Sequence, residues 1–211
     1  FGKAIVNLVN IEKDEKINAA IAVKDFSEKL FVLMATKQGT IKKTELSEFA
    51  KPRSNGIRAI TLDETDILVD AVVTNGEKQI MLATANGMAI KFHENDARPM
   101  GRTASGVRGI KLDNDYVIGM IIADDDKTVL TITENGFGKR SPVSDYRLIS
   151  RGGSGVINIK CSERNGKVVV IKKLNDDDEV MMMSQNGIMI RVPAKQIPVI
   201  GRNTQGVTLM K

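Results

Sequence analysis

Side chains that carry thiol, imidazole or metal chemistry are scarce in this sequence. Cysteine and histidine occur once each, as Cys161 and His93, and tryptophan does not occur. These counts exclude an intrachain disulfide and a zinc cluster of cysteines and histidines, and they leave His93 as the single imidazole available to a serine-type catalytic triad. We expect Cys161 to be a small core residue in an apolar strand and His93 to be a solvated loop residue. The chain is therefore predicted to hold no metal, no cofactor and no catalytic residue.

Long apolar runs are missing as well. No stretch comes near the roughly 20 apolar residues that cross a bilayer, and no signal peptide follows Phe1. We therefore expect a piece of a longer cytoplasmic protein with no membrane partner. Aromatic residues make up 4% of the chain and apolar residues 42%, so the core is expected to be aliphatic and rich in methionine.

What the sequence does contain is a repeat of about 50 residues. A glycine that follows an amide residue returns at intervals of 48, 49 and 51 residues, at Gln38-Gly39, Asn86-Gly87, Asn135-Gly136 and Asn186-Gly187. An apolar run precedes each glycine and a second short run follows it, such as LFVLMAT and TIKKT around the first copy. This pattern predicts β-hairpins, because both residues of a tight Asn-Gly turn need positive φ.

One position of the repeat is always basic. The fourth residue after the hairpin glycine is Lys43, Lys91, Arg140 or Arg191. We expect these four side chains to lie exposed on the return strands of the hairpins and to form one binding surface. The alternative is that they are ordinary solvated edge residues.

Each hairpin is followed by an irregular loop with an arginine and then a glycine, after which another strand begins. The pairs are Arg53/Gly56, Arg102/Gly106, Arg151/Gly155 and Arg202/Gly206, and the strands read GIRAITL, GVRGIKL, GVINIKC and GVTLMK. The same element opens the chain at residues 3–8. The loop guanidinium groups suit two roles, hydrogen bonding to loop carbonyls or contact with an anionic partner, and both stay open.

The repeat also predicts the fold class. Phased on these strands, the chain holds units at about 4–43, 57–92, 107–140 and 156–192 and the start of a fifth at 207. Each unit has short strands and no helical apolar period, although residues 46–50 and 194–197 could each form a short turn of helix. We predict a single all-β domain, a propeller-like array of about four blades that bury one another's faces. Met181, Met182 and Met183 precede the last hairpin turn and are expected to pack in the core.

Charge is segregated along the repeat. The segments from each return strand to the strand after the arginine loop, residues 40–58, 89–108, 138–156 and 189–206, carry a net charge of +11, so the rest carries −6 against the total of +5. Acidic residues gather in other turns, at 12–15, 63–66, 113–115, 124–126 and 176–179. Because every unit repeats one geometry, we expect a basic stripe along one edge of the array.

Short motifs carry a resemblance to a known family. ERNG at 163–166, GRNTQGV at 201–207, GVRGIKL at 106–112, ATANG at 83–87 and the opening IVNLV resemble the C-terminal domain of the bacterial DNA gyrase A subunit, and the likeness runs through essentially all 211 residues. The resemblance implies a six-bladed β-pinwheel that wraps DNA around its basic rim, of which this chain covers about four blades. It also implies double-stranded DNA as a partner, together with the rest of the gyrase A subunit, through which the domain would meet the gyrase B subunit.

The resemblance further implies an accessory role. In that family the wrapped DNA supports the introduction of negative supercoils by an ATP-dependent type II topoisomerase, whose catalytic tyrosine and ATPase lie elsewhere. This chain alone is then expected to catalyse nothing, with Tyr116 and Tyr146 as packing or rim residues. The family's gyrase box, Q-R-R-G-G-K-G, has no full copy here, since SRGGSG at 150–155 matches only its R-G-G-x-G part and resembles the equivalent loop of a later blade.

The expected DNA contacts are the basic residues of the return strands and the loops. They are Lys42, Lys43, Arg53, Arg58, Lys91, Arg102, Arg108, Lys139, Arg140, Arg151, Arg191, Lys195 and Arg202. The related C-terminal domain of the topoisomerase IV A subunit is the alternative within this interpretation. A propeller-type scaffold that binds acidic proteins is the alternative from a different class.

Overall fold

The computed structural model describes residues 15–26, 29–53 and 56–210, and it contains the four predicted hairpins. They are formed by β1 (Phe31–Thr36) with β2 (Thr40–Glu45), β4 (Gln79–Thr84) with β5 (Met88–His93), β8 (Thr128–Thr133) with β9 (Phe137–Pro142), and β12 (Glu179–Met183) with β13 (Met189–Pro193). The turn glycines have φ between +74° and +87°, as the turn pattern predicts. At Gly136 a Cβ atom would also lie 2.1 Å from the carbonyl oxygen of Met210, so only glycine fits that turn.

Two further strands complete each of the first three hairpins. β3 (Leu68–Thr74), β7 (Val117–Ala123) and β11 (Val168–Leu174) pair with the first hairpin strands β1, β4 and β8. β6 (Val107–Arg108), β10 (Val156–Ile157) and β14 (Val207–Thr208) pair with the return strands β2, β5 and β9. Each of these last three strands lies beyond the next hairpin in the chain. Each of these sheets therefore receives its outer strand from a later part of the chain, and all pairings within these sheets are antiparallel.

A short 3-10 helix follows each hairpin. These helices are η2 (Leu46–Phe49), η3 (Glu94–Asp96), η4 (Val143–Asp145) and η5 (Ala194–Gln196). The sequence predicted a turn of helix at the first and last of these places, and both are confirmed. The two middle turns were missed, although they occupy the same position of the repeat.

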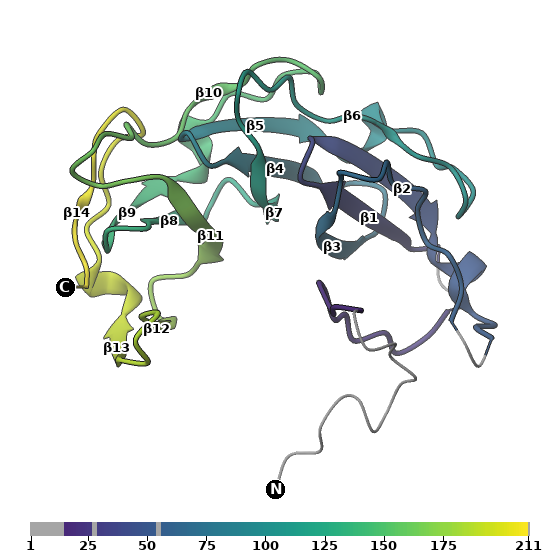
Figure 1. Ribbon diagram of the computed structural model, residues 1–211, viewed down its shortest axis with the longest axis horizontal. Helices are drawn as coiled ribbons and strands as arrows, with labels where there is room; N and C mark the ends of the chain where they lie inside the picture. The colour runs from purple at the N-terminus through teal and green to yellow at the C-terminus, as the bar shows by residue number, and fades with distance from the viewer. Residues whose placement is uncertain (1–14, 27–28, 54–55, 211) are drawn as a thin grey trace, which may run out of the picture.

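The blades follow one another along an arc (Figure 1). β3, β7 and β11 lie on its concave side, and β6, β10 and β14 with their loops lie on its convex side. Apolar clusters fill the spaces between blades: Leu33 and Ala35 of the first blade pack with Ile80 and Leu82 of the second. The all-β, propeller-like prediction is confirmed. The opening strand predicted at residues 3–8, and with it the start of the first unit, lies outside the described residues. No helix in the described part of the chain is long and apolar enough to cross a membrane.

The methionine run is only partly a core element, so the prediction is wrong for two of its three residues. Met182 is 8% exposed, whereas Met181 and Met183 are each 64% exposed. Successive side chains of a strand point to opposite faces. Met81, at the position of Met181 in the second hairpin, packs against Val129 of the next blade. β12 and β13 form a two-stranded sheet, and no blade follows them among the described residues, so the matching face stays open.

The single cysteine and histidine also differ from expectation. Cys161 lies in a loop after β10 and not in a strand. It is half-buried against the apolar cluster that contains Met81 and Val129, and burial raises the pKa of its thiol. His93 is the last residue of β5, and its Nδ1 accepts a hydrogen bond from the backbone N–H of Asn95 in η3. It caps the helical turn instead of lying in a loop.

Candidate nucleic-acid interface

The periodic basic residues of the return strands are buried in three of the four copies. Lys43, Lys91 and Arg140 are 1%, 4% and 3% exposed, so the expectation of exposed side chains is wrong for them. Each lies directly across its hairpin from an apolar residue, namely Leu33, Met81 and Leu130. Directly opposite residues of an antiparallel pair share a face of the sheet, and these apolar partners belong to the interblade clusters. The basic side chains therefore point into the spaces between blades.

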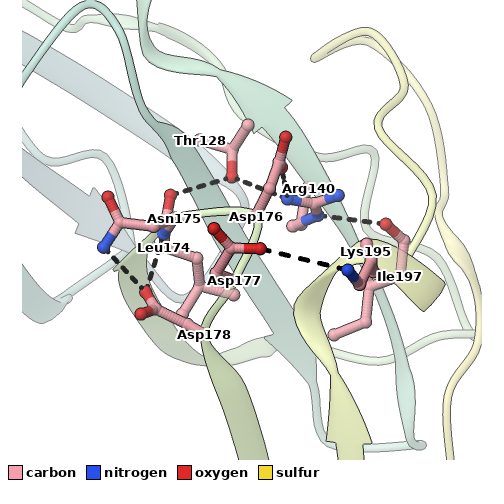
Figure 2. A network of polar contacts seen from close by, with 9 residues as sticks. All are labelled: Thr128, Arg140, Leu174, Asn175, Asp176, Asp177, Asp178, Lys195 and Ile197. Carbon is pink, nitrogen blue, oxygen red and sulfur yellow. Dashed lines mark hydrogen bonds and ion pairs between the residues drawn. The ribbon is translucent and has the colours of Figure 1, made fainter.

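Each buried cation is paired with a carboxylate of the following unit. Lys43 Nζ lies 3.0 Å from Glu94 Oε2, Lys91 Nζ lies 2.6 Å from Asp125 Oδ1, and Arg140 Nη1 lies 2.6 Å from Asp176 Oδ1. Figure 2 shows the third of these pairs, in which Arg140 Nε also donates to the carbonyl of Ile197 at 3.0 Å. The recurring charge of this repeat position thus links one blade to the next.

Glu94 shows how strongly such a pair can be held. Burial alone would raise the pKa of its carboxyl group. Hydrogen bonds from the Thr74 hydroxyl, the Lys78 backbone N–H and Lys43 outweigh burial and hold that pKa below its usual value. The carboxylate is ionised in the folded chain and completely buried.

Arg191 is the exception among the four copies. Its side chain is 66% exposed and pairs with Glu179 of its own hairpin. It lies opposite the exposed Met181. The environment of this copy differs because the face on which it lies has no described neighbour.

Lys42 and Lys139, two further expected DNA contacts, are also buried. Lys42 Nζ donates to the carbonyls of Ala59, at 2.7 Å, and of Arg102. Lys139 Nζ donates to the carbonyls of Gly201 and Arg202, both at 2.8 Å, and to the Ser141 hydroxyl at 3.0 Å. Desolvation lowers the pKa of each ammonium group to about 8. Neither amine can reach a phosphate directly.

The loop arginines make one recurring contact. Arg102, Arg151 and Arg202 donate from Nη1 to the carbonyls of Arg58, Arg108 and Ile157, at 3.2, 2.9 and 2.7 Å. Each acceptor lies two residues after the crossover glycine of the preceding unit, so the pinning role that the sequence left open is present in three copies. All three arginines are half-buried and keep donors free for a second partner. Arg53 is exposed.

The crossover strands β6, β10 and β14 and their loops lie on the convex side of the arc (Figure 1), and several exposed arginines belong to these segments. Arg58, Arg108 and Lys195 are exposed, so their predicted contact with DNA stays a prediction that their accessibility allows. Arg98 and Arg147 are exposed too, and the sequence interpretation missed them. A signal was available, because each lies four residues before a loop arginine, Arg102 or Arg151.

A sequence comparison connects this geometry with a known family. The family described as DNA gyrase C-terminal domain, beta-propeller, matches residues 31–75, 78–124, 127–180 and 178–211. The chain belongs to this gyrase family. Among curated relatives, the DNA gyrase A subunit of Halalkalibacterium halodurans is 54% identical and that of Klebsiella oxytoca 44% identical, each over the whole chain. The chain spans 25% and 24% of these two relatives.

Solved structures agree with the gyrase-family assignment. A DNA gyrase A C-terminal domain superposes with a TM-score of 0.88 and 25% identity, covering 99% of this chain and 71% of the other. The C-terminal domain of a DNA topoisomerase IV superposes with a TM-score of 0.92, also at 25% identity, covering 100% of this chain and 66% of the other. The fold is thus common to both kinds of domain.

Proposed function

We propose that this domain binds duplex DNA along its convex edge, without preference for a sequence, and bends the DNA around the arc. The observation that carries the proposal is the recurrence of exposed arginines on one edge of successive blades. Arg98 and Arg147 lie 49 residues apart at the same place of the repeat. Cations at regular intervals along a curved edge neutralise phosphates along a bent duplex and read no bases.

The structure changes which residues belong to the proposed contact surface. Lys43, Lys91 and Arg140 are paired between blades, and Lys42 and Lys139 lie under loops, so these five leave the set of direct contacts. The proposed rim is formed by Arg53, Arg58, Arg98, Arg102, Arg108, Arg147, Arg151, Lys195 and Arg202. Arg191, on the open face of the last hairpin, is a weaker candidate, because its guanidinium already pairs with Glu179.

In the longer protein the domain would act as the accessory C-terminal part of the DNA gyrase A subunit. Its proposed protein partners are the other domains of that subunit, through which it would meet the gyrase B subunit. By presenting wrapped DNA it would support the introduction of negative supercoils, while bond cleavage and ATP hydrolysis take place in other parts of the enzyme. The relatives named above are gyrase A subunits, which favours gyrase over topoisomerase IV.

The test is a wrapping assay on a nicked plasmid that is sealed in the presence of the domain. A wrapped duplex retains writhe, so we expect the linking number of the sealed plasmid to shift in proportion to the bound domain. A variant with Arg98→Glu and Arg147→Glu serves as the matched control and should leave the linking number unchanged. A protein-interaction scaffold would give no shift with the unchanged chain either, and that result would contradict the proposal.

A further inference from the structure

Two buried lysines lie directly beneath the loops that carry rim arginines. Lys42 in β2 and Lys139 in β9 are both 0% exposed. The ammonium group of Lys42 bonds to the backbone carbonyl of Arg102, and that of Lys139 to the backbone carbonyl of Arg202. The main chain of each rim arginine is thus held by a lysine from the hairpin one unit earlier in the chain.

The side chains of the same arginines are fixed at their other end. Arg102 donates to the carbonyl of Arg58, and Arg202 donates to the carbonyl of Ile157. The lysine holds the backbone of each arginine, and the carbonyl of the crossover strand or loop holds its guanidinium group. An ammonium group has three N–H donors, and Lys139 Nζ donates to three acceptors, so a lysine matches the hydrogen-bonding groups of this site.

The repeat provides its own comparison. Ile90 occupies the matching position in the second hairpin, three residues after its turn glycine. The loop above it carries Arg151 and has no lysine beneath it. The backbone N–H of Arg151 donates to Asp96 Oδ2 at 3.3 Å, as that of Arg102 donates to Glu48 Oε2 at 3.1 Å, and Arg151 Nε also donates to the Asp96 carbonyl at 2.8 Å. A lysine at this position therefore occurs only in some of the described blades, and a blade can fold without it.

We propose that Lys42 and Lys139 are positioning residues for DNA binding, which hold the Arg102 and Arg202 loops in the conformation that presents the two guanidinium groups on the rim. This inference rests on the proposed function. A buried charge that is satisfied by carbonyls gives charge-assisted hydrogen bonds, which are about twice as strong as neutral ones. The positive charge also stays under the path of the duplex, where it adds to the attraction for phosphates.

The first test measures the loops without DNA. Arg102 and Arg202 are themselves trypsin sites, so limited trypsin digestion with mass spectrometry of the fragments reports how often each loop opens. Lys139→Met should speed cleavage after Arg202 about tenfold, the effect of losing one charge-assisted bond. Cleavage after Arg151 should not change. Ile90→Met is the matched control and should leave cleavage after all three arginines unchanged.

The second test uses the pH dependence of DNA binding. Charged groups that face Lys42 are Glu48 and Arg102, and those that face Lys139 are Arg202 and Asp145. Burial raises the pKa of the neighbouring Tyr146 phenol. Affinity of the unchanged chain for a random-sequence duplex should fall about fivefold between pH 7 and pH 9.5 as the two ammonium groups lose their protons, because each lost positive charge removes attraction for the phosphates above it.

The two readouts also separate positioning from simple stabilisation. Folded-state pKa values near 8 lie below the ordinary value of 10.5, so the unfolded chain binds more protons and the free energy of unfolding should rise between these pH values. DNA affinity should fall over the same range. In the Lys42→Met, Lys139→Met double variant, affinity at pH 7 should already be reduced and its fall with pH should disappear.

Unchanged trypsin protection in Lys139→Met overturns the inference, and so does faster cleavage without any change in DNA affinity. If the double variant does not fold, the pH profile of the unchanged chain decides, and a flat profile overturns the inference. A chain that is protected from trypsin but binds no DNA at any pH contradicts the proposed function instead.

Discussion

Arg140 and Asp176, which lie 36 residues apart in the chain, form a 2.6 Å ion pair across the boundary between the third and fourth hairpins. The Arg140 side chain is 4% exposed and the Asp176 side chain 77% exposed, so the pair is a buried cation held by an accessible anion (Figure 2). The buried Arg140 guanidinium is satisfied by hydrogen bonds to Asp176 and to the Ile197 carbonyl. The basic residue at this repeat position therefore serves cohesion between blades in three of its four copies.

The first prediction concerns this buried guanidinium. Arg140→Met should lower the free energy of unfolding by about 1 to 3 kcal/mol, because the Ile197 carbonyl loses its charged donor. Chemical denaturation measures the change. Arg191→Met, at the same repeat position but exposed, is the matched control and should change stability by less than about 0.5 kcal/mol. Equal losses in both variants would show that burial does not distinguish the two copies.

Changing the three buried cations to glutamate should consequently unfold the domain before any effect on DNA can be measured. Glutamate at the position of Lys43 would face Glu94, a like charge in a space without water. Loss of DNA binding by such variants, together with an unchanged melting temperature, would place these residues on the rim after all. Circular dichroism of each purified variant provides the check.

The second prediction is the pH dependence of the Lys43–Glu94 pair. The pKa of Glu94 is lowered in the folded chain, so its contribution to stability is present above its ordinary value of 4.5 and is lost as pH falls through the folded value. Glu94→Gln should lower stability at pH 7 and flatten the decline between pH 5 and pH 3. Urea unfolding at several pH values measures this. Parallel curves for both proteins would exclude Glu94 as the titrating group.

The third prediction concerns the salt dependence of DNA binding. If about six to eight phosphates are neutralised, log K against log salt should have a slope of roughly −5 to −7. Arg98→Ala and Arg147→Ala should each make the slope shallower by about 1 without changing the melting temperature. Lys172→Ala removes the same charge from β11 on the concave side and should leave the slope unchanged. A slope near zero for the unchanged chain would contradict electrostatic wrapping.

The fourth prediction concerns the double role of a loop arginine. Arg151 donates to the carbonyls of Asp96 and Arg108, so Arg151→Ala should lower the free energy of unfolding by about 0.5 to 1.5 kcal/mol and also weaken DNA binding. Arg147→Ala, four residues earlier, should weaken DNA binding alone. Comparing thermal melting with DNA titration separates the two effects. Unchanged melting in Arg151→Ala would mean that the carbonyl contacts are not needed for stability.

The architecture could be predicted from the sequence because hairpin turns have strict local requirements. Positive φ at the turn glycines and alternating apolar strands fix where each hairpin lies. The exposure of Lys43 could not be read from its periodicity, since a constant place in a repeat does not say whether that place faces water or the next blade. Register would have helped, because the turn at Gly39 puts Lys43 opposite Leu33.

Other parts of the candidate site depend on contacts between distant segments. Lys139 reaches the Arg202 carbonyl over 63 residues, a contact to which no local pattern points. The open face of the last hairpin was missed for a similar reason. Met181 occupies the repeat position of the buried Met81, but no blade among the described residues packs against its face of β12 and β13.

Each of the first three sheets receives its outer strand from a later part of the chain, and this affects how the chain folds during synthesis. The first sheet begins at Phe31 but needs Arg108 to finish, and the second begins at Gln79 but needs Ile157. During translation, the nascent chain must therefore pass through the next hairpin before the preceding sheet gains its outer strand. Until that strand has been synthesised, the return strand of the preceding sheet has an unpaired edge. The sheets are therefore completed in chain order, from the first blade onward.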